Sequence, residues 1–149
     1  HHVCKQDPAD SRNTADAFHE TSVTHSIFKI LAENSLVLAR LNLNNGEYEI
    51  LKRDYRLHGR GLELEHDFES YNRRILDEKL IHPDDEERYR ARITLSSLHN
   101  FFFDGKKQLS YQFCRQLNNK YIPTVMEFFA GNRCDVQNPW IVVLIREIS

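Results

Sequence analysis

An imidazole and two carboxylates lie within four consecutive residues of this chain, at His82, Asp84 and Asp85. Imidazole and carboxylate side chains are common metal ligands and proton carriers, so this segment is a candidate for a metal site or for acid–base catalysis. Adjacent residues on a turn rarely point at one metal, and the sequence has no second His or Cys cluster at ligand spacing. The favoured interpretation is a helix cap, and if Asp84 is that cap, Asp84→Ala costs about 1 kcal/mol.

Arg115 is the second candidate. The two-residue alternation over residues 109–117 puts its guanidinium on the apolar face of a strand. A buried guanidinium needs an anion, which can be an internal Asp or Glu or the carboxylate of a bound metabolite that fits its flat fork. If the anion is a ligand, helix face and strand parity suggest Tyr71, Tyr111 and Tyr121 as pocket walls.

Other catalytic motifs have little support. Gly59-Arg60-Gly61 lacks the strand-to-helix context and the Lys-Ser/Thr pair of a phosphate-binding loop, so we predict a flexible loop there. No Ser, His and Asp set in the sequence has the turn or oxyanion context that a nucleophile requires. We therefore expect no catalytic activity in this segment, and neither a metal ion nor a cofactor.

Length and composition limit the class of protein. The 149 residues suffice for one domain and are too few for two ordinary ones. A formal charge of -2 gives no basic footprint for nucleic acid, so proteins or small molecules are the expected partners. Three cysteines at scattered spacings form no disulfide framework, and no apolar run approaches the roughly 20 residues of a membrane span, which favours a cytoplasmic location.

The first third of the chain is expected to hold a helix and a hairpin. Residues 1–14 are polar and aperiodic, as in a flexible leader or the remnant of a tag, and the domain itself is expected to occupy residues 15–149. Apolar residues at helical spacing predict an amphipathic helix over residues 15–34. Asn44-Asn45-Gly46 then joins two apolar segments within residues 36–51, which predicts a β-hairpin.

The middle of the chain is predicted to be helical. Asp67 can cap a helix that continues to the break at Pro83. Pro83 lacks an N–H and restricts His82, so one helix must end before it and another can begin there. Acidic residues in the first turn favour that second helix, which we expect to be unbroken over residues 83–103 and to end at Gly105.

Three antiparallel strands are predicted to follow, at residues 109–117, 121–130 and 140–148, with a tight turn at Asn118-Asn119. The last two strands are apolar on both faces, so the sheet needs a cover on each side. Helices are expected on one side, and the amphipathic helix of residues 15–34 or a partner subunit on the other. We therefore predict a homodimer joined through that helix and the outer sheet face.

Three motifs resemble those of one known family. Ile81-His82-Pro83-Asp84-Asp85-Glu86-Glu87-Arg88 is similar to the "hPDD" segment of PAS sensory domains found beside bacterial diguanylate cyclase and histidine kinase modules. The ending Glu147-Ile148-Ser149 is similar to the Asp-Ile-Thr that often ends them. Tyr111-Gln112-Phe113-Cys114-Arg115 resembles the "eyR" strand of this family, although Tyr121 stands where its next strand commonly has Trp. The resemblance covers roughly residues 20–149.

The PAS resemblance implies an α+β fold with a five-stranded antiparallel sheet and helices over one face. It implies a sensory module of a larger bacterial signalling protein, which binds a small molecule between helices and sheet or simply pairs with another PAS domain. It also implies that Glu147 links the last strand to an exit helix and so transmits the signal. From the residues alone, Glu147 is only a carboxylate at the end of a strand, and a solvated side chain is an equal alternative.

Two cofactors of PAS relatives are disfavoured. Cys114 before Arg115 resembles the flavin-reactive segment of light sensors, but that cysteine belongs in a helix and Cys114 lies in a predicted strand. His99 lies in the helix that carries a ligand in haem-binding relatives, but near the helix end, where a cation simply complements the dipole. Cys114 and Cys134 are expected to be thiols of ordinary reactivity.

Two other functions stay open. An NTF2-like binding protein or enzyme also packs helices on a curved sheet, and a helical segment at residues 36–51 would favour it. A PAS scaffold that binds no ligand and only dimerises would have a filled interior, to which Phe101-Phe102-Phe103 could contribute.

Overall fold

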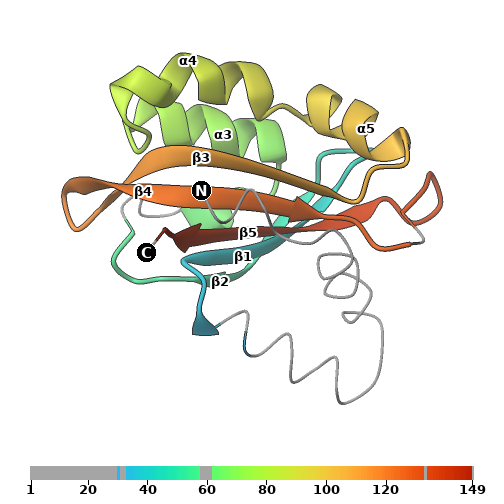
Figure 1. Ribbon diagram of the computed structural model, residues 1–149, viewed down its shortest axis with the longest axis horizontal. Coiled ribbons are helices and arrows are strands. Elements are labelled where there is room, and N and C mark those ends of the chain that lie inside the picture. Colours follow the sequence, from blue (N-terminus) through green and yellow to red (C-terminus); the bar gives the residue numbers. More distant parts are fainter. Residues whose placement is uncertain (1–29, 31–32, 58–61, 133, 149) are drawn as a thin grey trace.

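A five-stranded antiparallel sheet forms the centre of the computed structural model (Figure 1). The structure describes residues 30, 33–57, 62–132 and 134–148. The strand order is β2-β1-β5-β4-β3, so the last strand of the chain lies in the middle of the sheet. The predicted α+β class and five-stranded antiparallel sheet are thus confirmed. The strands are β1 (Val37–Asn42), β2 (Tyr48–Arg53), β3 (Gln108–Leu117), β4 (Lys120–Phe129) and β5 (Trp140–Glu147).

Both predicted hairpins form at residues that tolerate positive φ. Gly46 has a φ of 80° in the turn between β1 and β2. Its carbonyl accepts a hydrogen bond from the backbone N–H of Phe68, which brings the next helix against the hairpin. Asn118 and Asn119 have φ values of 52° and 66°, as a two-residue turn of the primed type requires, and they join β3 to β4.

Three α-helices lie over one side of the sheet: α3 (Phe68–Asp77), α4 (Pro83–Arg92) and α5 (Leu95–Phe103) (Figure 1). A short 3-10 helix, η2 (Leu62–Leu64), precedes them. As predicted, Asp67 caps α3 by accepting a hydrogen bond from the N–H of Ser70 at 3.0 Å. The helix ends at Asp77, earlier than the predicted proline break, because Lys79 takes a left-handed φ of 58°.

The predicted unbroken helix over residues 83–103 is wrong, because the chain breaks between α4 and α5 at Ile93 and Thr94. Thr94 is extended and its hydroxyl accepts a hydrogen bond from the N–H of Ser97 at 3.1 Å, so it caps α5. Ile93 is buried, and its carbonyl accepts a hydrogen bond from the side chain of Asn72 at 3.4 Å. A cap and a tertiary contact thus outweigh helix propensity at this point.

The segment before α4 protects the edge of the sheet. Ile81 forms an antiparallel bridge with Arg115 of the edge strand β3. The N–H of His82 donates to the carbonyl of Cys114 at 2.9 Å, and the N–H of Gln116 donates to the carbonyl of Leu80 at 2.8 Å. An edge strand paired in this way has fewer free backbone groups for another chain.

Buried apolar side chains lie on both faces of the sheet, as predicted. The larger core lies between the sheet and the helices, and a second cluster of Leu38, Phe129 and Leu144 with the partly buried Val142 lies on the outer face. None of the three α-helices described here lies over that outer face (Figure 1). The predicted cover, an amphipathic helix over residues 15–34, falls outside the described residues except at its end. The predicted leader, residues 1–14, lies entirely outside them.

At that end, the N–H of Asn34 donates to the carbonyl of Ile30 at 3.2 Å, as in a helical turn. None of the helices in the described ranges is both long and apolar enough to cross a membrane.

Candidate functional site

Four large polar side chains are buried between the sheet and the helices. Arg115 of β3 is only 2% exposed, and Tyr48 of β2, Tyr71 of α3 and Tyr89 of α4 are at most 1% exposed. The guanidinium of Arg115 interacts electrostatically with all three tyrosines. We call these four side chains, together with Asn72 of α3, the interior cluster. Its members come from helices α3 and α4 and from strands β2 and β3.

Ring packing positions the tyrosines. The rings of Tyr48 and Tyr71 lie 4.8 Å apart, and that of Tyr48 also lies 5.4 Å from Phe68. The ring of Tyr89 meets that of Phe113 edge to face at 5.0 Å. Such aromatic contacts hold each ring in one orientation, so the hydroxyl groups have defined directions.

One part of the interior cluster has its hydrogen bonds satisfied. The hydroxyl of Tyr89 donates to Oδ1 of Asn72 at 2.8 Å. The amide of Asn72 donates in turn to the carbonyl of Ile93, at the break between α4 and α5. This part of the cluster is structural, because it ties the two helices together.

The other part has unsatisfied donors. Among the described residues, neither the hydroxyls of Tyr48 and Tyr71 nor Nε and Nη2 of Arg115 have a partner in good hydrogen-bond geometry. The Tyr71 hydroxyl nevertheless lies close enough to Tyr48 and to Arg115 for a weak interaction that contributes to the raised pKa of both. The sequence predicted that Arg115 pairs either with an internal Asp or Glu or with the carboxylate of a ligand. Among the described residues, no Asp or Glu pairs with Arg115, whose electrostatic partners are tyrosines. A buried charge without a partner is costly and rare in folded proteins.

The cluster is positively charged. Burial raises the pKa of Tyr48 well above its ordinary value, and burial raises the pKa of Tyr89 as well, so both hydroxyls keep their protons. For Arg115, burial acts to lower the pKa but the three tyrosines raise it, and the pKa lies above its ordinary value. The groups without a well-formed hydrogen bond are thus the guanidinium of Arg115 and the hydroxyls of Tyr48 and Tyr71. Together they favour an acceptor that carries negative charge.

Only some of the predicted ligand-binding residues come together. Tyr71 and Arg115 meet in the interior cluster. Tyr111 is half-buried, and its ring lies 6.0 Å from that of Phe113, which in turn contacts Tyr89 of the cluster. Tyr121 is not brought to it, because it pairs with Gln116 in the ladder and its hydroxyl donates to the carbonyl of Lys79 at 2.7 Å.

Sequence reasoning missed three members of the cluster: Tyr48, Asn72 and Tyr89. Helical spacing could have indicated Tyr89, since it stands four residues before the buried Ile93. The direction of a hydroxyl or an amide inside a core depends on tertiary packing, which the sequence pattern does not reveal.

The side chains of His82 and Asp85 have different partners, and that of Asp84 is exposed, with its Oδ2 3.9 Å from Nδ1 of His82. Nδ1 of His82 accepts a hydrogen bond from the N–H of Asp84 at 3.0 Å. A helix cap is therefore present as predicted, but the capping residue is His82, and the prediction that Asp84 caps the helix is wrong. Asp85 accepts instead from the N–H of Cys114 at 2.8 Å and from Arg88 at 3.1 Å, which ties α4 to β3. In the ranges that the structure describes, no three His, Cys, Asp or Glu side chains are grouped as metal ligands would be.

The cap leads to a matched pair of substitutions. His82→Ala is expected to lower the free energy of unfolding by about 1 kcal/mol, because α4 loses its N-terminal acceptor. Asp84→Ala should change it by less than about 0.5 kcal/mol, because its side chain is exposed. Urea unfolding of both variants checks this. A larger loss for Asp84→Ala than for His82→Ala would contradict the assignment.

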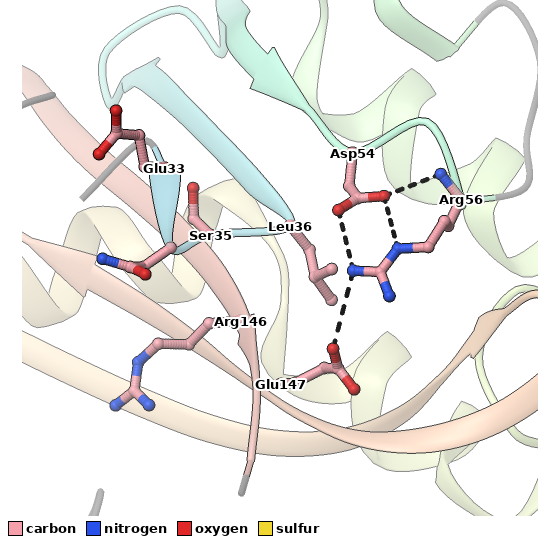
Figure 2. Close-up of a pocket in the computed structure, with 8 residues that line it drawn as sticks. Glu33, Ser35, Leu36, Asp54, Arg56, Arg146 and Glu147 are labelled. Atoms are coloured by element: carbon pink, nitrogen blue, oxygen red, sulfur yellow. Dashed lines mark hydrogen bonds and ion pairs between the residues drawn. The ribbon is translucent and has the colours of Figure 1, made fainter. Parts of the chain in front are cut away.

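A second site lies where the chain enters and leaves the sheet. A cleft of about 440 Å³ is lined by residues 33–36 before β1, the loop after β2 and the end of β5 (Figure 2). We call it the exit cleft. It contains Glu147, the predicted signal-transmitting residue. Its lining residues are Glu33, Asn34, Ser35, Leu36, Asp54, Arg56, Arg146 and Glu147.

Arg56 connects two walls of the exit cleft. Its Nε and Nη2 donate to the two carboxylate oxygens of Asp54, each at 3.0 Å, and Nη2 also lies 3.8 Å from Oε1 of Glu147 (Figure 2). The hydrogen bond from Arg56 lowers the pKa of Asp54, against the opposing effect of burial. The carboxylate of Glu147 is half exposed, so its pairing with Arg56 can be broken at little cost.

This pairing predicts a dependence of stability on pH. Because the pKa of Asp54 is lowered in the folded state, its contribution is complete above the unfolded pKa, about 3.9, and is lost as pH falls through the folded pKa. Asp54→Asn is expected to lower the urea midpoint at pH 7, with the difference from wild type shrinking below about pH 4. Urea titrations at several pH values measure this. A difference that stays constant down to pH 3 would contradict it.

The candidate cofactor residues have ordinary surroundings. Cys114 lies on the outer face of β3, and burial together with the nearby Asp85 raises its pKa. Burial likewise raises the pKa of Cys134. Both thiols are therefore less reactive than an exposed cysteine. The ring of His99 packs against Phe103 at 4.3 Å.

No protein-family model matches this chain, and no curated protein matches it either.

Proposed function

We propose that this chain is a PAS-type sensory and dimerisation module of a larger bacterial signalling protein, acting in the cytoplasm and without catalysis of its own. The supporting evidence is the motif resemblance together with a five-stranded antiparallel sheet that carries helices over one face. The observation that carries the sensory part is Arg115, whose charge is buried with two nitrogens unpartnered among the described residues. A scaffold that only dimerises gains nothing from such a charge.

The NTF2-like alternative has less support. It predicted a helix over residues 36–51, where the structure has β1 and most of β2. The filled-scaffold alternative is supported by Phe102, which is buried, but Phe101 and Phe103 are only partly buried. The filled scaffold also leaves the Arg115 guanidinium without a role.

We further propose a route from the interior cluster to the exit cleft. Leu117 lies two residues beyond Arg115 and forms a bridge with Leu57. Leu57 directly follows Arg56, which pairs with Glu147 at the end of the central strand. A ligand that moves Arg115 along β3 would shift this loop and change the pairing of Glu147, from which an output segment would continue.

Dimerisation would use the outer face of the sheet. Leu38, Phe129 and Leu144 are at most 4% exposed there, on the face opposite the described helices. These side chains are already covered within the single chain. We propose that the amphipathic segment of residues 15–34 supplies this cover and that a second copy of the chain pairs through that segment.

Native mass spectrometry of the chain, purified without denaturation, tests the proposed function. A dimer that carries a non-covalently bound small molecule is expected. A monomer with an empty interior, at protein concentrations well above micromolar, would contradict both parts. Deletion of residues 1–34 should convert the dimer to a monomer, whereas a dimer of unchanged affinity would rule out the proposed interface.

A further inference from the structure

We propose that the interior cluster binds the carboxylate of a small monoacid, which accepts hydrogen bonds from one edge of the Arg115 guanidinium and from the hydroxyls of Tyr48 and Tyr71. The role of this ligand as a signal depends on the proposed function, but the binding site itself does not. The site lies between β2, β3 and α3.

The pattern of unsatisfied nitrogens indicates a carboxylate. Nε and Nη2, the two nitrogens of Arg115 without partners among the described residues, form the same edge of the planar guanidinium. Two N–H bonds on that edge are parallel and match the two oxygens of a carboxylate. A spherical anion would satisfy this edge less well, because it offers a single centre.

The tyrosines add two donors. The hydroxyls of Tyr48 and Tyr71 interact only weakly with each other and have no partner in good hydrogen-bond geometry within the described residues. Burial raises the pKa of Tyr48, so its hydroxyl remains a donor. Each carboxylate oxygen has more than one lone pair, so it can accept from Arg115 and from a hydroxyl together. Tyr89 is excluded from this role because its hydroxyl already donates to Asn72.

The net charge of the site favours a monoanion. The electrostatic partners of Arg115 in the described structure are Tyr48, Tyr71 and Tyr89, so a single positive charge is available. Burying a dianion such as phosphate against one guanidinium would leave a negative charge uncompensated. The rings of Tyr48, Phe68 and Tyr71 pack together beside the charge, which favours a short apolar tail over a polar one.

Thermal unfolding with a set of small probes tests the proposal. The probes are sodium acetate, propionate and benzoate at millimolar concentrations, with sodium chloride at equal ionic strength and propionamide as the neutral analogue. At least one acid is expected to raise the melting temperature by about 5 °C at a hundredfold excess over its Kd. Chloride and propionamide should leave it unchanged.

Variants locate the binding site. Isothermal titration of the acid that stabilises most is expected to show about a hundredfold weaker binding to Arg115→Met, since a bidentate charged interaction is lost. Tyr71→Phe should weaken binding severalfold. Arg90→Met is the matched control, because Arg90 is an exposed arginine of α4, and its affinity should equal that of wild type.

Each result decides between the two proposals. Equal stabilisation by chloride, no stabilisation by any acid, or unchanged affinity in Arg115→Met overturns the carboxylate site. A neutral compound found by native mass spectrometry would overturn the carboxylate site and leave the proposed sensory function in place. The opposite outcome is a protein that is monomeric and empty as purified, but that the acids stabilise in wild type and not in Arg115→Met. This result would support the carboxylate site and overturn the proposed sensory and dimerisation function.

Discussion

Replacing Arg115 with methionine is expected to stabilise the ligand-free domain, raising the free energy of unfolding by about 2 kcal/mol. Arg115 is 2% exposed, and two of its nitrogens have no hydrogen-bond partner among the described residues. At neutral pH the hydroxyls of Tyr48 and Tyr89 are protonated, because burial raises their pKa values, so they offer Arg115 no opposite charge. Folding therefore removes a charge from water without full compensation, whereas methionine has a similar length and loses nothing on burial. Urea unfolding of wild type and Arg115→Met, each freed of bound small molecules, measures the difference.

The sign of this effect separates two roles for Arg115. If a carboxylate of the protein paired with it in solution, Arg115→Met would be destabilised by about 3–5 kcal/mol, because the carboxylate would be left buried alone. Arg90→Met, the same substitution at an exposed position of α4, controls for the loss of one positive charge and should change stability by less than about 0.5 kcal/mol. A destabilised Arg115→Met beside a neutral control would end the ligand-site interpretation.

Arg146→Ala is expected to lower the free energy of unfolding by about 2 kcal/mol, the largest loss among these variants. Nε of Arg146 lies 3.0 Å from Oε1 of Glu127, a carboxylate that is only 1% exposed on the outer face of the sheet. Removal of one partner leaves the other buried without compensation, a loss of about 3–5 kcal/mol when both are buried. We reduce this figure because the Arg146 side chain is 32% exposed and water can partly replace it.

A second substitution tests the mechanism of this loss. Glu127→Gln removes the charge and keeps the shape, so the double variant Glu127→Gln with Arg146→Ala should recover most of the stability. Urea unfolding of the two single variants and the double variant gives the coupling energy. Additive losses would show that the pair does not interact, and that Arg146 acts through packing alone.

The sheet could be predicted from the sequence because its signals are local. Gly46 and the Asn118-Asn119 pair mark turns that need positive φ, and the alternation around Arg115 assigns the face of β3. The break at Thr94 has a local signal, since threonine is a common helix cap, but the contact from Asn72 that accompanies it is distant in sequence.

The candidate sites were only partly predictable for the same reason. Strand parity identified Arg115 as an inward-facing cation, but it did not show that tyrosines rather than a carboxylate surround it. The network of Asp54, Arg56 and Glu147 joins a loop to the end of a strand about 90 residues later, and no periodic pattern connects them. Side-chain partners of this kind follow from the tertiary fold.

The Nε–Hε resonance of Arg115 in a ¹H–¹⁵N NMR spectrum tests the central claim most directly. It is assigned by its loss in Arg115→Lys, and propionate is titrated at constant ionic strength against chloride. We predict a shift of this resonance that saturates with propionate, as expected for a carboxylate on that edge of the guanidinium. A resonance that does not move with propionate, or moves equally with chloride, would contradict the claim.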